Sequence, residues 1–187
     1  MAAVIDDLKN LKPSNQLPTF HAIVRHLSYH GSPVALSMNK RIFDLIAEYE
    51  RETKKDFSFF KIDKYKEILF VTDQTLLSEF RKFLDGNGYQ SDENINVAGK
   101  NFATFDRDFL STLNDWKEFK IARRVLDPAI LYVEPQDKYL PNTKDCKVRS
   151  GLFVGKEECT HNAVIDAQEV IELIRHKLLP NYNEILK

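Results

Sequence analysis

Apolar and polar positions alternate with two different periods along the chain, and each change of period predicts a change of element. The stretch "TFHAIVRHLSYHG" (19–31) is rich in β-forming residues and ends at a glycine, which predicts a strand followed by a turn. From Pro33 to about Glu52 apolar residues recur every three or four positions, which predicts a helix opened by proline. The same spacing between Leu76 and Leu84 predicts a second helix, which "DGNG" ends.

The later apolar runs are shorter. "NINVAGKN" predicts a short strand that leads to a glycine, and a helix is expected to start near Asp106. Pro128 interrupts the apolar run "RRVLDPAILYV", and the polar stretch 135–159 predicts a long functional loop. A last helix is predicted from about Val164 to Leu179. Strands come first and helices then alternate with short strands, which indicates an α/β fold with helices packed on a mixed sheet.

Length and composition place this pattern in one domain, residues 1–187, with a sizeable core. The chain is 43% hydrophobic and 29% charged, as is typical of soluble globular proteins. Its net charge of −1 provides no bulk attraction to nucleic acid, so any such contact must be local. Cys146 and Cys159 lack the spacing of a zinc site and predict a cytoplasmic location, although a disulfide between them stays open. No membrane span or secretory signal is expected.

Two aspartates and a histidine stand where helices are predicted to begin. Asp166 lies in the first turn of the last helix, whose dipole favours a carboxylate, and His161 precedes it in a loop. Asp106 follows "NFATF" at a predicted strand-to-helix junction. Taken singly, each has an ordinary explanation: a helix-start carboxylate, a surface histidine and a helix cap. Taken together, they could converge at one sheet edge, where carboxylates bind Mg²⁺ or Mn²⁺ and a histidine activates water.

The segments "GKNFATFDRDFL" and "HNAVIDA" resemble the second and third motifs of the DEDDh 3′–5′ exonucleases, in the ribonuclease-H-like superfamily. The resemblance spans nearly the whole chain and implies a ribonuclease-H-like mixed sheet flanked by helices. It implies that His161 is the general base and that Asp106 and Asp166 bind two Mg²⁺ or Mn²⁺ ions. It also assigns Asn101 and Phe105 to substrate binding, although by pattern alone the aromatic residues of this motif favour the core. The implied reaction is phosphodiester hydrolysis at the 3′ end of single-stranded nucleic acid.

The first motif of that family, an aspartate, any residue and a glutamate on the first strand, has no counterpart here. "VIDDLKN" offers Asp6 and Asp7 followed by Leu8, so the second carboxylate is absent. Because the first strand is central in this superfamily's sheet, its loss is expected to leave two strand edges unpaired, which favours association into a homo-oligomer. We therefore expect an incomplete metal site and little turnover. A missing N-terminal segment, a truncated gene start and a diverged homologue all stay open as causes.

Basic and aromatic residues suggest further contacts. The segment "KKDFSFFKIDKYK" (54–66) suits a single strand through stacking and charge, and it equally suits a solvated loop. Lys144, Lys147 and Arg149 are weaker candidates for phosphate contact. Two other functions stay open: a non-catalytic module that keeps the fold and binds nucleic acid or protein, and a phosphoesterase that acts on small nucleotides.

Overall fold

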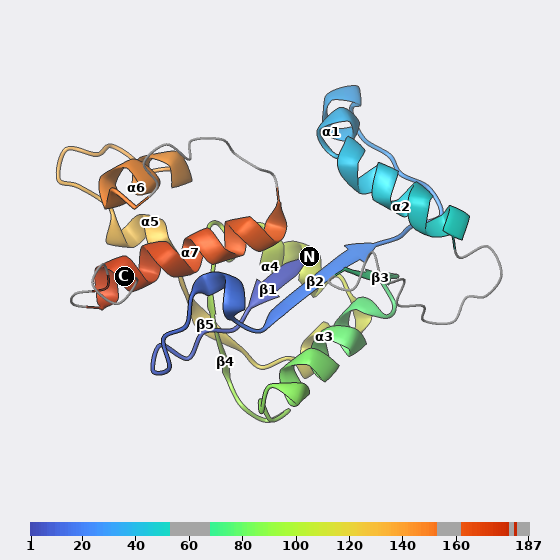
Figure 1. The fold of residues 1–187 in the computed structure, drawn as a ribbon, viewed down its shortest axis with the longest axis horizontal. Helices are drawn as coiled ribbons and strands as arrows, with labels where there is room; N and C mark the ends of the chain where they lie inside the picture. Colours follow the sequence, from blue (N-terminus) through green and yellow to red (C-terminus); the bar gives the residue numbers. More distant parts are fainter. Residues whose placement is uncertain (53–67, 153–161, 180–181, 183–187) are drawn as a thin grey trace.

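The computed structural model describes residues 1–52, 68–152, 162–179 and 182, and these form a mixed α/β fold (Figure 1). The predicted α/β class is therefore confirmed, and the ribonuclease-H-like sheet stays a prediction. The described strands form two small sheets. In the first, β1 is antiparallel to β2 and β2 is parallel to β3; in the second, β4 is parallel to β5. The bounds are β1 (Ala2–Val4), β2 (Thr19–Val24), β3 (Leu69–Val71), β4 (Ile95–Ala98) and β5 (Ile121–Leu126).

Most helices lie where the apolar spacing predicts them. The helix predicted from Pro33 is divided at Asn39 into two shorter ones, which project from the end of β2 (Figure 1). The helix expected near Asp106 is also short, and a separate 3₁₀-helix follows it. The bounds are α1 (Pro33–Met38), α2 (Lys40–Glu52), α3 (Leu76–Gly86), α4 (Asp106–Ser111), α5 (Pro128–Leu131), α6 (Thr143–Ser150) and α7 (Ala163–Leu178), with 3₁₀-helices at Ser14–Gln16 and Asn114–Glu118. Among the described residues, none of the helices has the length and apolar character to cross a bilayer.

The prediction of a long loop over 135–159 is wrong for residues 143–150, because these form α6. Asn142 starts this helix: its side chain accepts a hydrogen bond from the Asp145 amide, and the Asp145 carboxylate accepts one from the Asn142 amide. Gly151 ends it in the left-handed conformation, with φ of 68°. Cys146 is its one buried hydrophobic residue and carries a free thiol. Cys159 lies outside the described residues.

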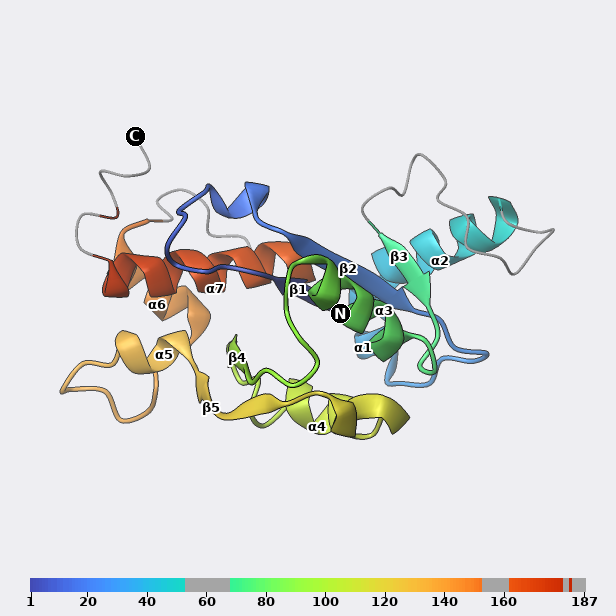
Figure 2. The same ribbon diagram turned by 90° about the horizontal axis from the view of Figure 1, so that it is seen from below.

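One hydrophobic cluster joins the two sheets. Phe20 and Ala22 of β2 belong to it, and so does Ile95 of β4. The helix α3 contributes most of the remaining buried side chains, which are Leu76, Leu77, Phe80 and Leu84. In Figure 2, β4 and β5 lie below β1 and β2 rather than beside them in one continuous sheet. The described strands of the two sheets are therefore not joined by a ladder of backbone hydrogen bonds, but both sheets pack against the same hydrophobic cluster.

A buried ion pair fixes α7 to the amino-terminal strand. The Arg175 side chain is fully buried, with 0% exposure. Its Nε and Nη2 donate to the Asp6 carboxylate at 2.7 and 2.8 Å, and its Nη1 donates to the carbonyl of Lys12 at 2.6 Å. Because Asp6 follows β1, these bonds hold β1 and its following loop against the helix. Burial of a guanidinium is tolerated when its donors are satisfied in this way.

Arg175→Ala is expected to destabilise the chain by roughly 3–5 kcal/mol, because it leaves the Asp6 carboxylate buried without its partner. The urea midpoint of unfolding, followed by circular dichroism, measures this loss. Arg123→Ala is the matched control, since Arg123 is exposed on β5 and its removal should cost no more than about 0.5 kcal/mol. Equal midpoints for the two variants would contradict a structural role for the ion pair.

Candidate functional site

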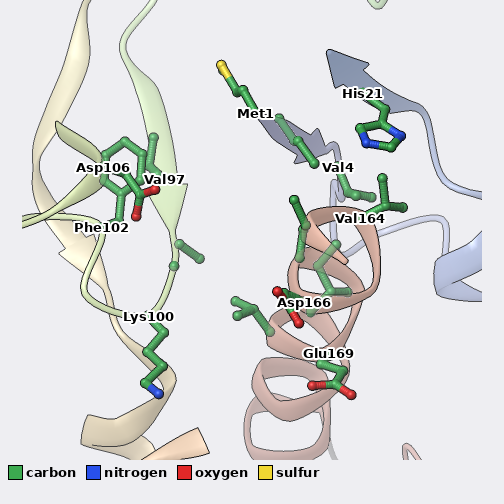
Figure 3. A pocket seen from close by; sticks show the side chains of 18 of the residues that line it. Met1, Val4, His21, Val97, Lys100, Phe102, Asp106, Val164, Asp166 and Glu169 are labelled. Atoms are coloured by element: carbon green, nitrogen blue, oxygen red, sulfur yellow. The ribbon is translucent and has the colours of Figure 1, made fainter. Parts of the chain in front are cut away.

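A pocket of about 1800 Å³ opens between β1, β4, α4 and α7 (Figure 3). Residues 1–6 line one side of it, residues 95–100 line another, and the first turns of α4 and α7 complete it. These segments are far apart in the sequence, so only the tertiary fold brings them together. The volume exceeds the roughly 300–1,000 Å³ of a typical small-molecule site.

Asp106 is the first residue of α4 and lines this pocket. The cap position belongs to Phe105, and no side chain caps the helix, so Asp106 is not held in place as a helix cap. Burial raises the pKa of the Asp106 carboxyl, and the nearby ammonium of Met1 opposes this effect. Asp106 therefore presents its carboxyl to the pocket and remains exposed to solvent there.

Asp166 occupies the first turn of α7, as predicted, and lines the same pocket. Asn162 caps the helix with its Oδ1, which accepts from the amides of Val164 at 3.0 Å and Ile165 at 3.4 Å. Figure 3 shows Asp106 and Asp166 on opposite walls of the pocket. The fold thus brings the two predicted carboxylates to one site without placing them side by side. His161, the predicted general base, lies outside the described residues.

Asn101 and Phe105 do not line the pocket. Asn101 adopts a left-handed conformation with φ of 56°, and its amide donates to the Asp127 carboxylate at 3.0 Å. The expectation that Phe105 is buried is wrong, because its side chain is 74% exposed. Phe102 instead packs against the core, close to Gly99. Both rings follow Asn101, in a turn in which the amides of Thr104 and Phe105 donate to the Asn101 carbonyl, and an alternating pattern alone does not reveal such a turn.

Lysines contribute positive charge to the walls. Lys100 and Lys144 line the pocket, and so does Lys147, whose ammonium lies 2.6 Å from the Glu169 carboxylate. The sequence predicted phosphate contact for Lys144 and Lys147 but not for Lys100. Only the position of Lys100 in the segment of the second motif could have indicated it. The basic segment 54–66 lies outside the described residues.

Arg149 has a different role from the one its neighbouring lysines suggest. Its guanidinium binds both oxygens of Asp137, at 2.6 and 2.8 Å, and also donates to the carbonyl of Tyr132. The hydrogen bonds from Arg149 lower the pKa of Asp137 to about 2. Arg149 does not line the pocket, and it fixes the segment before α6 instead.

The carboxylates in the described part of the chain do not by themselves make a metal site. No group of three or more histidine, cysteine, aspartate or glutamate side chains there could hold a metal ion. Asp6 and Glu169 also line the pocket, but both are engaged in ion pairs. Asp106 and Asp166 lie on opposite walls. The described ligand set is therefore too small for the two-metal site that the motif resemblance implies.

Asp106→Asn is expected to stabilise the chain at about pH 7 and to lose this advantage toward about pH 3. Because the pKa of Asp106 is raised in the folded chain, the stability associated with this carboxyl falls as the pH rises through that pKa. Asparagine removes the cost of ionisation, and below the unfolded pKa of 3.8 both forms are neutral. Urea unfolding across this range measures the difference.

Asp108→Asn is the matched control. It removes the same charge from the first turn of the same helix, at a position that does not line the pocket. The same pH-dependent gain in both variants would show that general charge reduction, rather than the pocket, causes the effect.

Comparisons with protein-family models, with curated proteins and with solved structures found no match for this chain.

Proposed function

We propose that the chain is a 3′–5′ exonuclease-like domain of ribonuclease-H-like type, and that it binds the 3′ end of a single strand in the pocket between β1, β4 and α7. The observation that supports this proposal is that Asp106 and Asp166, from the second and third motifs, line one pocket. Each stands at the start of a different helix. A nucleic-acid end that enters between them meets carboxylates from two sides.

The charges of the pocket support a phosphodiester ligand. Lys100 and Lys144 lie on its walls and would offset the charge of the phosphate backbone. Their positive charge is local, which agrees with a chain whose net charge is only −1. The size of the pocket, about 1800 Å³, suits several nucleotides better than one.

We further propose that this chain alone hydrolyses nucleic acid weakly or not at all. The two carboxylates on opposite walls are fewer than a two-metal phosphodiesterase requires, and the first motif of the family has no counterpart in the sequence. An N-terminal segment that adds carboxylates, or association of copies through open strand edges, would change this activity. The cytoplasmic location stays a prediction.

Binding of a 5′-labelled single-stranded oligonucleotide, measured by fluorescence anisotropy with Mn²⁺ or with chelator, tests the proposal. In Mn²⁺, Asp106→Asn and Asp166→Asn are expected to weaken binding at least about tenfold, because a carboxylate that joins the phosphate to a cation is lost. In chelator, the same variants should bind as well as the parent or better, because a charge that repels phosphate is gone. Asp108→Asn is the matched control.

Strand shortening is the second readout of the same experiment. Little or no shortening is expected in Mn²⁺ over hours. Robust shortening that disappears in His161→Ala would refute the proposal that the site is incomplete. Oligonucleotide binding that no pocket variant alters, in either condition, would refute the pocket as the binding site.

A non-catalytic binding module is the second candidate, and the small ligand set in the described residues favours it. In that case the lysines bind the strand directly and no cation takes part. Chelator should then leave the affinity unchanged. Lys100→Ala should weaken binding several-fold, and the loss should diminish as the salt concentration rises.

A further inference from the structure

The pocket has different surroundings at its two ends. At one end α6 contributes Thr143, Lys144 and Lys147 to the lining. At the other end α2 contributes Arg41 and Ile42. Figure 1 shows these two helices at opposite ends of the molecule. A strand whose end lies between the two aspartates therefore leaves the pocket toward one helix or the other.

The α6 end of the pocket is bounded by packed helices. The Lys147 ammonium lies 2.6 Å from the Glu169 carboxylate and joins α6 to α7, and the two side chains are only 12% and 16% exposed. The helix α6 also packs against α5. In Figure 3, Lys100 and Glu169 lie at the same end of the pocket, whereas Asp106 lies toward Met1. This end carries the positive charges of Lys100 and Lys144, so it suits the last nucleotide of a strand.

The other end leads to a projecting surface. The helices α1 and α2, here called the arm, extend from the end of β2 (Figure 1). Val34 and Met38 lie four residues apart on one face of α1 and are 68% and 58% exposed. Ile42 of α2 is 39% exposed and lines the pocket itself. Exposed apolar side chains that continue from a pocket are typical of a ligand-binding surface.

Arg41 places a positive charge where the arm meets the pocket. Its side chain is exposed, and no hydrogen bond or ion pair joins it to another described residue. The neighbouring Lys40, in contrast, is paired with Asp44 at 2.6 Å and does not line the pocket. A guanidinium matches the geometry of a phosphate and can donate two parallel hydrogen bonds to it. Arg41 can therefore bind a backbone phosphate without breaking an existing contact among the described residues.

We propose that the pocket binds a single strand in one direction. The 3′-terminal nucleotide lies at the α6 end beside Lys100, and the 5′ portion leaves over the arm, where Arg41 binds a backbone phosphate. This inference rests on the proposed function and specifies its substrate as a strand that extends beyond the pocket. A mononucleotide or a very short strand does not reach Arg41.

The first test compares strands of two lengths by fluorescence anisotropy. They have about 12 and about four nucleotides, within the usual range of single-strand sites. Arg41→Ala is expected to weaken binding of the longer strand several-fold and to reduce the slope of its salt dependence by about 0.7, because one phosphate contact is lost. The shorter strand should bind the variant and the parent equally. Arg41→Lys keeps the charge and should restore the slope.

Lys40→Ala is the matched control for Arg41→Ala. It removes the same charge from the adjacent position of the same helix, but its side chain does not line the pocket. It should leave the affinity for both strands nearly unchanged. An equal loss in Lys40→Ala and Arg41→Ala would show a general effect of charge and would contradict a phosphate contact at Arg41.

The second test measures the direction of the strand in the unaltered chain. A nitroxide is attached to one nucleotide at a time along the longer strand, and the broadening of backbone amide signals is followed by NMR. Labels near the 3′ end are expected to broaden the signals of Thr143 and Lys144 most. Labels toward the 5′ end should broaden those of Met38 and Ile42 most.

Three outcomes would overturn the inference: the reverse order of broadening, no broadening at the arm from any label, or an equal loss of both strand lengths in Arg41→Ala. They are distinguishable from failure of the proposed function. If no strand binds the parent chain, the proposed function itself is wrong. If strands bind and Lys100→Ala weakens them while Arg41→Ala does not, only the path over the arm is wrong.

Discussion

The ion pair between Arg175 and Asp6 fixes the position of α7 relative to the amino-terminal strand, and the candidate site depends on this position. A fully buried guanidinium is costly unless its donors are satisfied, and here two carboxylate oxygens and the carbonyl of Lys12 accept from it. The pair joins residues at opposite ends of the chain. With it in place, the first turn of α7 and its Asp166 carboxylate form one wall of the pocket.

The opposite wall of the pocket has a different origin. Asp106 begins α4, and the left-handed turn at Asn101 leads the chain from β4 toward that helix. Asp106 lines the pocket there, and the nearby Met1 ammonium opposes the rise that burial causes in the pKa of its carboxyl. Carboxylates on separate walls can approach a long ligand from two sides, and this geometry differs from the close cluster that chelates a single ion.

The division into two sheets is the second constraint on the site. A shared core holds β2 and β4 in one structure, yet β1 and β4 have no common hydrogen bond. Backbone donors and acceptors that border an apolar region are normally paired. The pocket lies between the two sheets, with β1 on one side and β4 on the other.

The sequence by itself determined the ranges of those helices in which buried apolar residues recur at regular spacing. The ranges of α3 and α7 followed from their apolar spacing. It missed α6, because that helix buries one hydrophobic side chain and depends on a capping box. Motif spacing singled out Asp106 and Asp166, whereas the apolar pattern assigned Phe105 to the core incorrectly, since its side chain is 74% exposed.

Only the tertiary structure decided which of these residues meet. Lys100 and Lys144 share a pocket with Asp166, although no local pattern relates the three. The division of the described strands into two sheets was likewise visible only once the strand order was known. The physical reason is that periodicity along a chain reports which face of an element is buried. The partner against which that face packs depends on shape and hydrogen bonding between distant segments.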